Sequence, residues 1–132
     1  MNYLAILVAS IISFGLGAVW YGPVFGKTWM KLEGMSMESL KNMPLSPTQA
    51  MVMGFINSLV MNAVLAWLIG ALSITTIAGA ITPLAIVWLG FVATNTIGDF
   101  LWKGRSFNLF LFNSSYQIIS LTIATVILVS WN

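Results

Sequence analysis

Six polar side chains lie within long apolar segments of this sequence, and they are the residues best suited to chemistry. They are Asn57, Asn62, Asn95, Asp99, Asn113 and Gln117. Amide and carboxylate groups that meet inside an apolar bundle can hold a small polar solute or an ion. The six therefore predict one polar pocket. The other interpretation is hydrogen bonding between helices, which needs no ligand.

Asp99 is the one ionisable member of this set. An ionisable side chain inside an apolar segment suggests proton coupling or cation binding. Lys103 follows four residues later, on the same face of a helix, and could pair with Asp99 instead. The ion pair is the favoured interpretation, and a role in binding a solute or an ion stays open.

The composition argues against several other classes of function. The chain contains no Cys and no His, and only three carboxylates. Thiolate chemistry, imidazole catalysis and zinc sites of the Cys/His type are therefore excluded. No phosphate loop, dinucleotide motif or basic tract is present. We expect no metal, no cofactor and no nucleic-acid partner, and the balance is against an enzyme.

The elements that must position these residues are membrane spans. Residues 42–98 contain no Asp, Glu, Lys or Arg, and such a stretch suits a bilayer, where a buried charge costs roughly 2.5–3.5 kcal/mol or more. Because a helix needs about 20 apolar residues to cross, the sequence predicts an all-α membrane bundle with four spans. One domain, residues 1–132, holds spans at about residues 3–21, 47–70, 75–102 and 107–131.

Local signals indicate where these helices begin and end. Pro23 stops the first span, because proline disfavours a helical residue before it. Ser46 can cap the second span and form a capping box with Gln49, and Ser106 can cap the fourth. The third span is long for one crossing, so we expect it to tilt or to kink at Pro83.

All the charged residues fall between spans one and two or close to the turn between spans three and four. The positive-inside rule puts both of these loops in the cytoplasm, with both termini outside. In the loop at residues 22–46, apolar residues alternate with Lys and Glu, which predicts a short helix at the membrane interface. Membrane lipid is therefore an expected partner.

Small or polar residues recur at every fourth position in three of the spans. The positions are Ala5, Ala9, Ser13 and Gly17, then Gly54, Ser58, Asn62, Ala66 and Gly70, then Gly90, Thr94 and Gly98. In lipid such stripes let helix backbones approach closely. Whether the stripes meet within one chain or between chains is not decided by the sequence. Because four short helices bury little surface, we expect a homo-oligomer.

Two segments carry a family resemblance. One runs from residue 17 to residue 30, and the other combines residues 88–92 with residues 104–116. They resemble the bacterial family called domain of unknown function 1761, whose members are small proteins with about four predicted spans. The resemblance implies a bacterial cytoplasmic (inner) membrane protein and brings no activity. It also draws attention to residues that could form a structured cytoplasmic cap, or merely an interface anchor and a turn: Trp20, Tyr21, Gly22, Pro23, Gly26, Lys27, Trp29, Gly104 and Arg105.

Two classes of function follow from these observations. The first is a small oligomeric transporter or channel, whose polar cluster holds or passes a small polar solute or an ion. The alternative is a non-transporting membrane module that binds a partner protein or a lipid, with the polar residues serving to hold the helices together.

Overall fold

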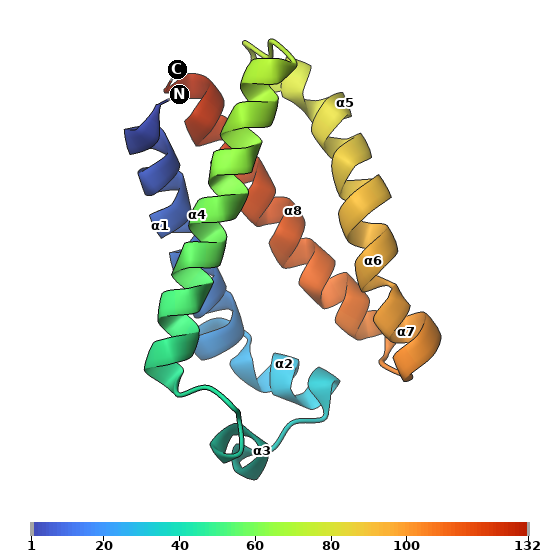
Figure 1. Ribbon diagram of the computed structural model, residues 1–132. Helices are drawn as coiled ribbons and strands as arrows, with labels where there is room; N and C mark the ends of the chain where they lie inside the picture. Colours follow the sequence, from blue (N-terminus) through green and yellow to red (C-terminus); the bar gives the residue numbers. More distant parts are fainter. Residues whose placement is uncertain (1, 132) are drawn as a thin grey trace.

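The structure is a computed structural model that describes residues 2–131, and it is built from helices (Figure 1). Four helical runs are long and apolar enough to cross a membrane, and we number them spans one to four: Tyr3–Val24, Pro47–Ala71, Ile77–Lys103 and Phe107–Ser130. The expected all-α bundle with four spans is confirmed. Met1 and Asn132, which complete the expected domain, lie outside the described residues.

The spans are assembled from shorter elements. In chain order these are α1 (Tyr3–Val19), η1 (Trp20–Val24), α2 (Gly26–Glu33), α3 (Met37–Lys41), α4 (Pro47–Ala71), α5 (Ile77–Val87), η2 (Trp88–Ala93), α6 (Thr94–Thr96), α7 (Gly98–Lys103) and α8 (Phe107–Ser130). The segments η1 and η2 are π-helical. Span one joins α1 to η1, span two is α4, span three runs from α5 to α7, and span four is α8.

The expected helix caps are present. The Ser46 side chain accepts a hydrogen bond from the backbone of Gln49, whose own side chain bonds back to Ser46, so the capping box of span two is complete. The side chain of Ser106 accepts from the backbone of Leu109 at the start of α8. Each cap satisfies backbone donors that a helix N-terminus leaves without partners.

Two spans depart from regular α-helix. In span one, Gly22 has non-helical backbone angles within η1, close to the break expected at Pro23. In span three the regular α-helix continues through Pro83 and first gives way at Trp88, where η2 begins. The irregularity of span three therefore lies at Trp88, not at Pro83.

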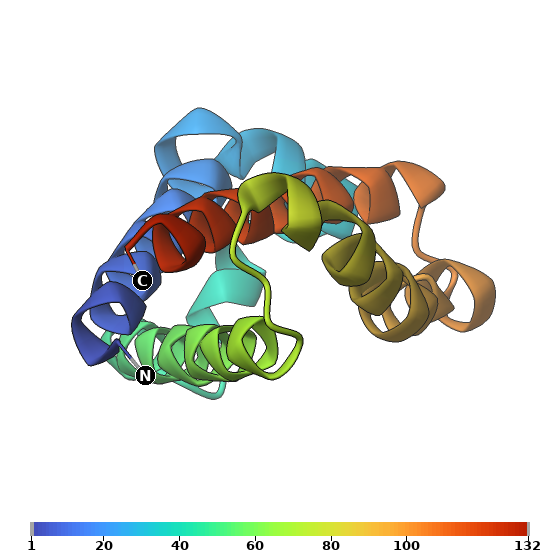
Figure 2. The ribbon, with the colours of Figure 1, turned by 90° about the horizontal axis from the view of Figure 1, so that it is seen from above.

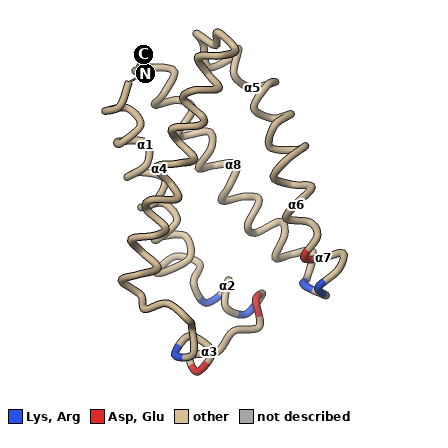
Figure 3. Tube along the Cα trace, viewed as in Figure 1, with Lys and Arg blue, Asp and Glu red and all other residues tan. Residues whose placement is uncertain are grey.

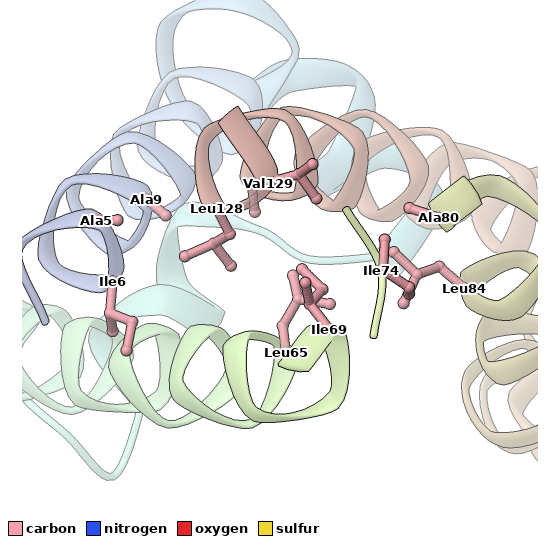
Figure 4. Close-up of a cluster of buried hydrophobic side chains, with 11 residues drawn as sticks. Ala5, Ile6, Ala9, Leu65, Ile69, Ile74, Ala80, Leu84, Leu128 and Val129 are labelled. Carbon is pink, nitrogen blue, oxygen red and sulfur yellow. The ribbon is translucent and has the colours of Figure 1, made fainter. Parts of the chain in front are cut away.

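Span one packs against two other spans, because α1 contacts both α4 and α8. Ala5 and Ala9 are completely buried in this contact, together with Leu65 of α4 and Leu128 of α8 (Figure 4). The small residues of span one thus meet neighbours within the chain. They allow the helix backbones to approach closely, as the four-residue spacing indicated.

Span three, unlike span one, packs mainly against a single other span, which is α8. Seen from above, α8 lies between α1 and span three (Figure 2). The small residues Gly90 and Thr94 are exposed, and no atom lies within 4 Å of where a side chain at Gly90 would begin. These two residues of the stripe are therefore open in the described chain.

The charged residues lie at one end of the bundle. They belong to α2, α3, α7 and the turn after α7 (Figure 3). Both ends of the chain and the turn between α4 and α5 lie at the opposite end (Figure 1). We call these the charged end and the terminal end.

Candidate functional site

A central cavity of about 490 Å³ lies between the four spans. Its walls are mostly apolar, with several hydroxyl and amide groups. The lining residues are Ser13, Phe14, Gly17, Ala18, Gly54, Asn57, Ser58, Met61, Val64, Leu65, Leu68, Leu84, Val87, Trp88, Val92, Tyr116, Gln117, Ser120 and Leu121. None of these is Asp, Glu, Lys or Arg.

Ser13 and Tyr116 build one polar wall of the central cavity. The Tyr116 hydroxyl donates a hydrogen bond to the backbone oxygen of Ser13, at 3.1 Å. Ser13 is 3% exposed, and its side-chain oxygen has no hydrogen-bond partner among the described residues. A buried hydroxyl without a partner is unfavourable, so a hydrogen bond from a ligand or a water molecule would stabilise this group.

Gly17 makes this arrangement possible. A Cβ atom at Gly17 would lie 2.8 Å from the Tyr116 hydroxyl oxygen, closer than real contacts allow. Only glycine therefore leaves room for the Tyr116 ring to reach Ser13.

Gln117 and Asn57, two of the six polar residues selected from the sequence, also line the central cavity. The ring nitrogen of Trp88 donates to the side-chain oxygen of Gln117 at 3.2 Å, which links span three to span four. Asn57 is exposed on α4. These two amides face the same space from different spans.

Asn62 is completely buried beside α1 and does not line the central cavity. Its amide nitrogen donates to the backbone oxygen of Ser58 at 2.9 Å, and the Ser58 hydroxyl donates to the backbone of Ser10 at 3.2 Å. The side-chain oxygen of Asn62 has no partner in the part of the chain that the structure describes. The Asn62 bond lies within α4, and the Ser58 bond joins α4 to α1.

Asn95 and Asp99 correct the expectation of a single polar pocket, because both are exposed. The Asn95 amide donates to the backbone oxygen of Phe91 in its own helix. Asp99 pairs with Lys103 at 3.2 Å, and its side chain is 55% exposed. The ion pair favoured from the sequence is thus present. Neither Asn95 nor Asp99 lines the central cavity, and Asp99 instead lines a much smaller pocket of about 20 Å³ together with Asn113.

Asn113, the last of the six, bonds to the loop motif instead. Its side-chain oxygen accepts a hydrogen bond of 2.7 Å from the Tyr21 hydroxyl. Around this bond lies a cluster of aromatic rings from η1, α2 and α8. Tyr21 packs edge-on against Trp29 and Tyr116, with ring centres 5.4 and 5.3 Å apart. Trp20 packs against Phe112 of the same cluster.

The remaining loop-motif residues shape the charged end of the bundle. A Cβ atom at Gly26 would lie 3.1 Å from the backbone oxygen of Tyr21, so this turn is tight. Gly104 has a φ of 71° and ends α7 in the left-handed conformation that glycine adopts easily. Arg105 donates to the backbone oxygen of Glu33 and lies 3.5 Å from its carboxylate. Pro23 and Lys27 are exposed.

Sequence reasoning did not select Ser13, Trp88, Tyr116 or Ser120 as candidate site residues. Ser13 and Gly17 were noticed only as part of a small-residue stripe. Their four-residue spacing was a usable signal for the contact with an aromatic residue, but the sequence does not say which helix lies opposite.

The arrangement describes a small multi-pass membrane protein with a central cavity that offers hydrogen bonds but no charge. Residues 4–129 match a family described as "Protein of unknown function (DUF1761)", and the chain belongs to this family. Among curated proteins and among solved structures, nothing matches. The family resemblance drawn from the two motifs is therefore confirmed.

Proposed function

We propose that this protein is a membrane module that holds a small uncharged ligand in its central cavity. The observation that carries the proposal is the cavity wall, to which all four spans contribute and which contains no Asp, Glu, Lys or Arg among its described residues. The volume of about 490 Å³ falls within the range of roughly 300–1,000 Å³ that is usual for small-molecule sites.

The same wall argues against a permanent ion as the ligand. Moving an ion from water into an apolar site is very unfavourable unless charged or numerous polar groups replace its hydration shell. Most of the lining residues are aliphatic or aromatic, and Asp99 lies outside the central cavity. An uncharged ligand with few hydrogen-bonding groups fits these walls better.

Carriage of the same ligand across the membrane is a second candidate function. Ser13, Ser58 and Gln117 each lie close to the middle of their span, which supports a polar site near the bilayer mid-plane. Membrane carriers commonly bind substrates at that depth. A flux assay in proteoliposomes with the retained ligand separates carriage from binding alone.

Native mass spectrometry of the protein released gently from membranes tests the proposal, because it detects a bound molecule of any identity. We expect a retained uncharged molecule whose occupancy falls at least fivefold in Val87→Phe, because the larger ring fills the central cavity. Ile86→Phe is the matched control, since Ile86 is 64% exposed and does not line the central cavity. Equal retention in both variants, or no retained molecule in the wild type, contradicts the proposal.

Asp99→Asn provides a further control for the role of charge. Because Asp99 is exposed and paired with Lys103, we expect this variant to retain the ligand as the wild type does. A large loss of ligand in Asp99→Asn would restore the ion or proton role that the sequence left open.

We also propose that the protein resides in the bacterial cytoplasmic membrane, with the charged end in the cytoplasm and both termini outside. The gathering of the basic residues at one end of the bundle supports this orientation.

The exposed small residues Gly90 and Thr94 support self-association through span three. The same mass spectra report the number of subunits.

A further inference from the structure

The central cavity has hydrogen-bonding groups near the middle of the spans and an apolar part that extends from there toward the terminal end. Its hydrogen-bonding groups include Ser13, Ser58 and Gln117, which are near the middle of their spans. The side chains of Leu65 and Leu68 line the cavity further along α4, toward the terminal end. Ser58 and Leu68 are ten residues apart in one helix, which corresponds to about 15 Å.

The central cavity is open to the side, next to α4. Met61 and Val64 both line it, yet they are 42% and 58% exposed. The opposite wall comes from Val87 and Val92 of span three, which packs mainly against α8. An opening between α4 and span three at this depth faces the hydrocarbon of the bilayer, so a ligand dissolved in lipid reaches it directly.

Ser13 marks where the polar group of such a ligand would bind. Ser13 is 3% exposed, and its buried hydroxyl oxygen has no hydrogen-bond partner among residues 2–131. The Tyr116 hydroxyl and the Gln117 amide lie on the facing helix and line the same part of the cavity. A single hydroxyl or carbonyl group on the ligand satisfies Ser13 without any charge.

We infer that the ligand is an uncharged amphiphile dissolved in the bilayer, with one hydroxyl or carbonyl group on an extended hydrocarbon chain. It enters sideways between α4 and span three. Its polar group bonds to Ser13 at the bilayer mid-plane, and its chain lies along Leu65, Leu68 and Leu84 toward the terminal end. This inference rests on the proposed function and adds the class of ligand, its route of entry and its orientation.

The depth of the polar groups excludes ordinary phospholipids. A phospholipid keeps its charged headgroup at the membrane surface, whereas the hydrogen-bonding part of this cavity lies near the bilayer centre. Pulling a phosphate group to that depth is strongly unfavourable. Burying the neutral hydroxyl or carbonyl group of a long-chain alcohol or ketone costs much less, and a hydrogen bond to Ser13 offsets that cost.

Photolabelling in phosphatidylcholine liposomes tests the inference with defined probes. The probe is a long-chain primary alcohol that carries a diazirine near the end of its chain. We expect it to label peptides that contain Leu65, Leu68 or Leu84, and excess unlabelled alcohol to suppress the labelling. A phosphatidylcholine with a diazirine at a matching chain position is the comparison probe. Labelling of these peptides by both probes to the same extent would overturn the inference.

Two variants assign the labelling to the central cavity. Val87→Phe should reduce labelling by the alcohol at least fivefold, whereas Ile86→Phe should not. Ser13→Ala removes one hydrogen bond and leaves the shape intact, so it should weaken the apparent affinity roughly two- to tenfold. Ser115→Ala is its control, because the Ser115 hydroxyl is exposed and bonds within its own helix. Circular dichroism of each variant verifies its helical content, and equal affinity in Ser13→Ala and Ser115→Ala contradicts the assignment of Ser13.

The outcome also distinguishes the inference from the proposed function. If mass spectra reveal a small water-soluble ligand that Val87→Phe releases, and the alcohol does not label the cavity, the proposed function stands and the amphiphile is wrong. If the alcohol fails to label and no retained molecule is found, both are wrong.

Discussion

The Tyr21 hydroxyl donates a hydrogen bond of 2.7 Å to the side-chain oxygen of Asn113, across 92 positions of sequence. Tyr21 belongs to the loop motif at the end of span one, and Asn113 belongs to the polar residues of span four. The bond therefore connects the loop motif to the set of six polar residues, which the sequence analysis treated as separate candidate sites. It holds η1 against α8 at the charged end, next to the polar wall of the central cavity.

Replacing Tyr21 by Phe should measurably destabilise the bundle. The variant keeps the ring contacts but leaves the Asn113 oxygen without its donor, which should lower the free energy of unfolding by about 1–2 kcal/mol. Denaturation by sodium dodecyl sulfate in mixed micelles, followed by circular dichroism, measures the change. Tyr3→Phe is the matched control, because Tyr3 is 78% exposed. Equal effects of the two substitutions would show that the Tyr21–Asn113 bond contributes nothing measurable.

Gly17→Ala should force the Tyr116 ring away from Ser13. The added methyl group would lie 2.8 Å from the Tyr116 oxygen, and overpacking of this kind costs about 1–3 kcal/mol. The same unfolding assay measures the loss. Gly15→Ala is the control, since no atom lies within 4 Å of its Cβ position.

A double-mutant cycle tests the cause of this loss. In a Tyr116→Phe background the clashing oxygen is absent, so Gly17→Ala should be less destabilising than in the wild type. Strict additivity of the two substitutions would contradict the proposed contact between Gly17 and the Tyr116 hydroxyl.

Arg105→Gln should release α2 from the turn between α7 and α8. Arg105 bonds to Glu33 at the end of α2, and removing that contact leaves α2 freer to open locally. We expect faster tryptic cleavage after Lys31, quantified by mass spectrometry, with a change in global stability of no more than about 1 kcal/mol. Lys103→Gln breaks only a pair within α7 and should leave cleavage after Lys31 unchanged. Similarly faster cleavage after Lys31 in both variants would contradict a specific role of the Arg105–Glu33 contact in holding α2.

The orientation can be tested because the sequence has no Cys. Single replacements Met43→Cys and Thr75→Cys put a thiol on the loops at the charged end and the terminal end, respectively. In intact cells a membrane-impermeant maleimide should label Thr75→Cys and should label Met43→Cys only after the membrane is opened. The reverse pattern would invert the proposed topology.

The class of protein could be predicted from the sequence for a simple physical reason. A long uncharged apolar stretch is compatible with few environments other than a bilayer, and a bilayer requires helices whose length matches its thickness. Helix caps are equally local, so the capping roles of Ser46, Gln49 and Ser106 follow from their positions in the sequence. Pairing of Asp99 with Lys103 depends on one turn of one helix and was accessible in the same way.

The site depended on information that local sequence does not carry. Whether an amide such as Asn95 or Gln117 faces a cavity is decided by the rotation of its helix and by the identity of the opposing helix. Asn95 follows the π-helical turn at Trp88–Ala93 in span three and bonds to its own backbone, whereas Gln117 on α8 lines the central cavity.

The sequence alone therefore determined the membrane class, the four spans, their caps and the concentration of charge at one end, because each follows from hydrophobicity or from contacts within a few residues. Only the tertiary structure decided that Gly17 admits Tyr116 beside Ser13 and that span three packs against α8, with an open flank beside α4. These features are relations between helices, and small rotations of a helix change which side chains meet.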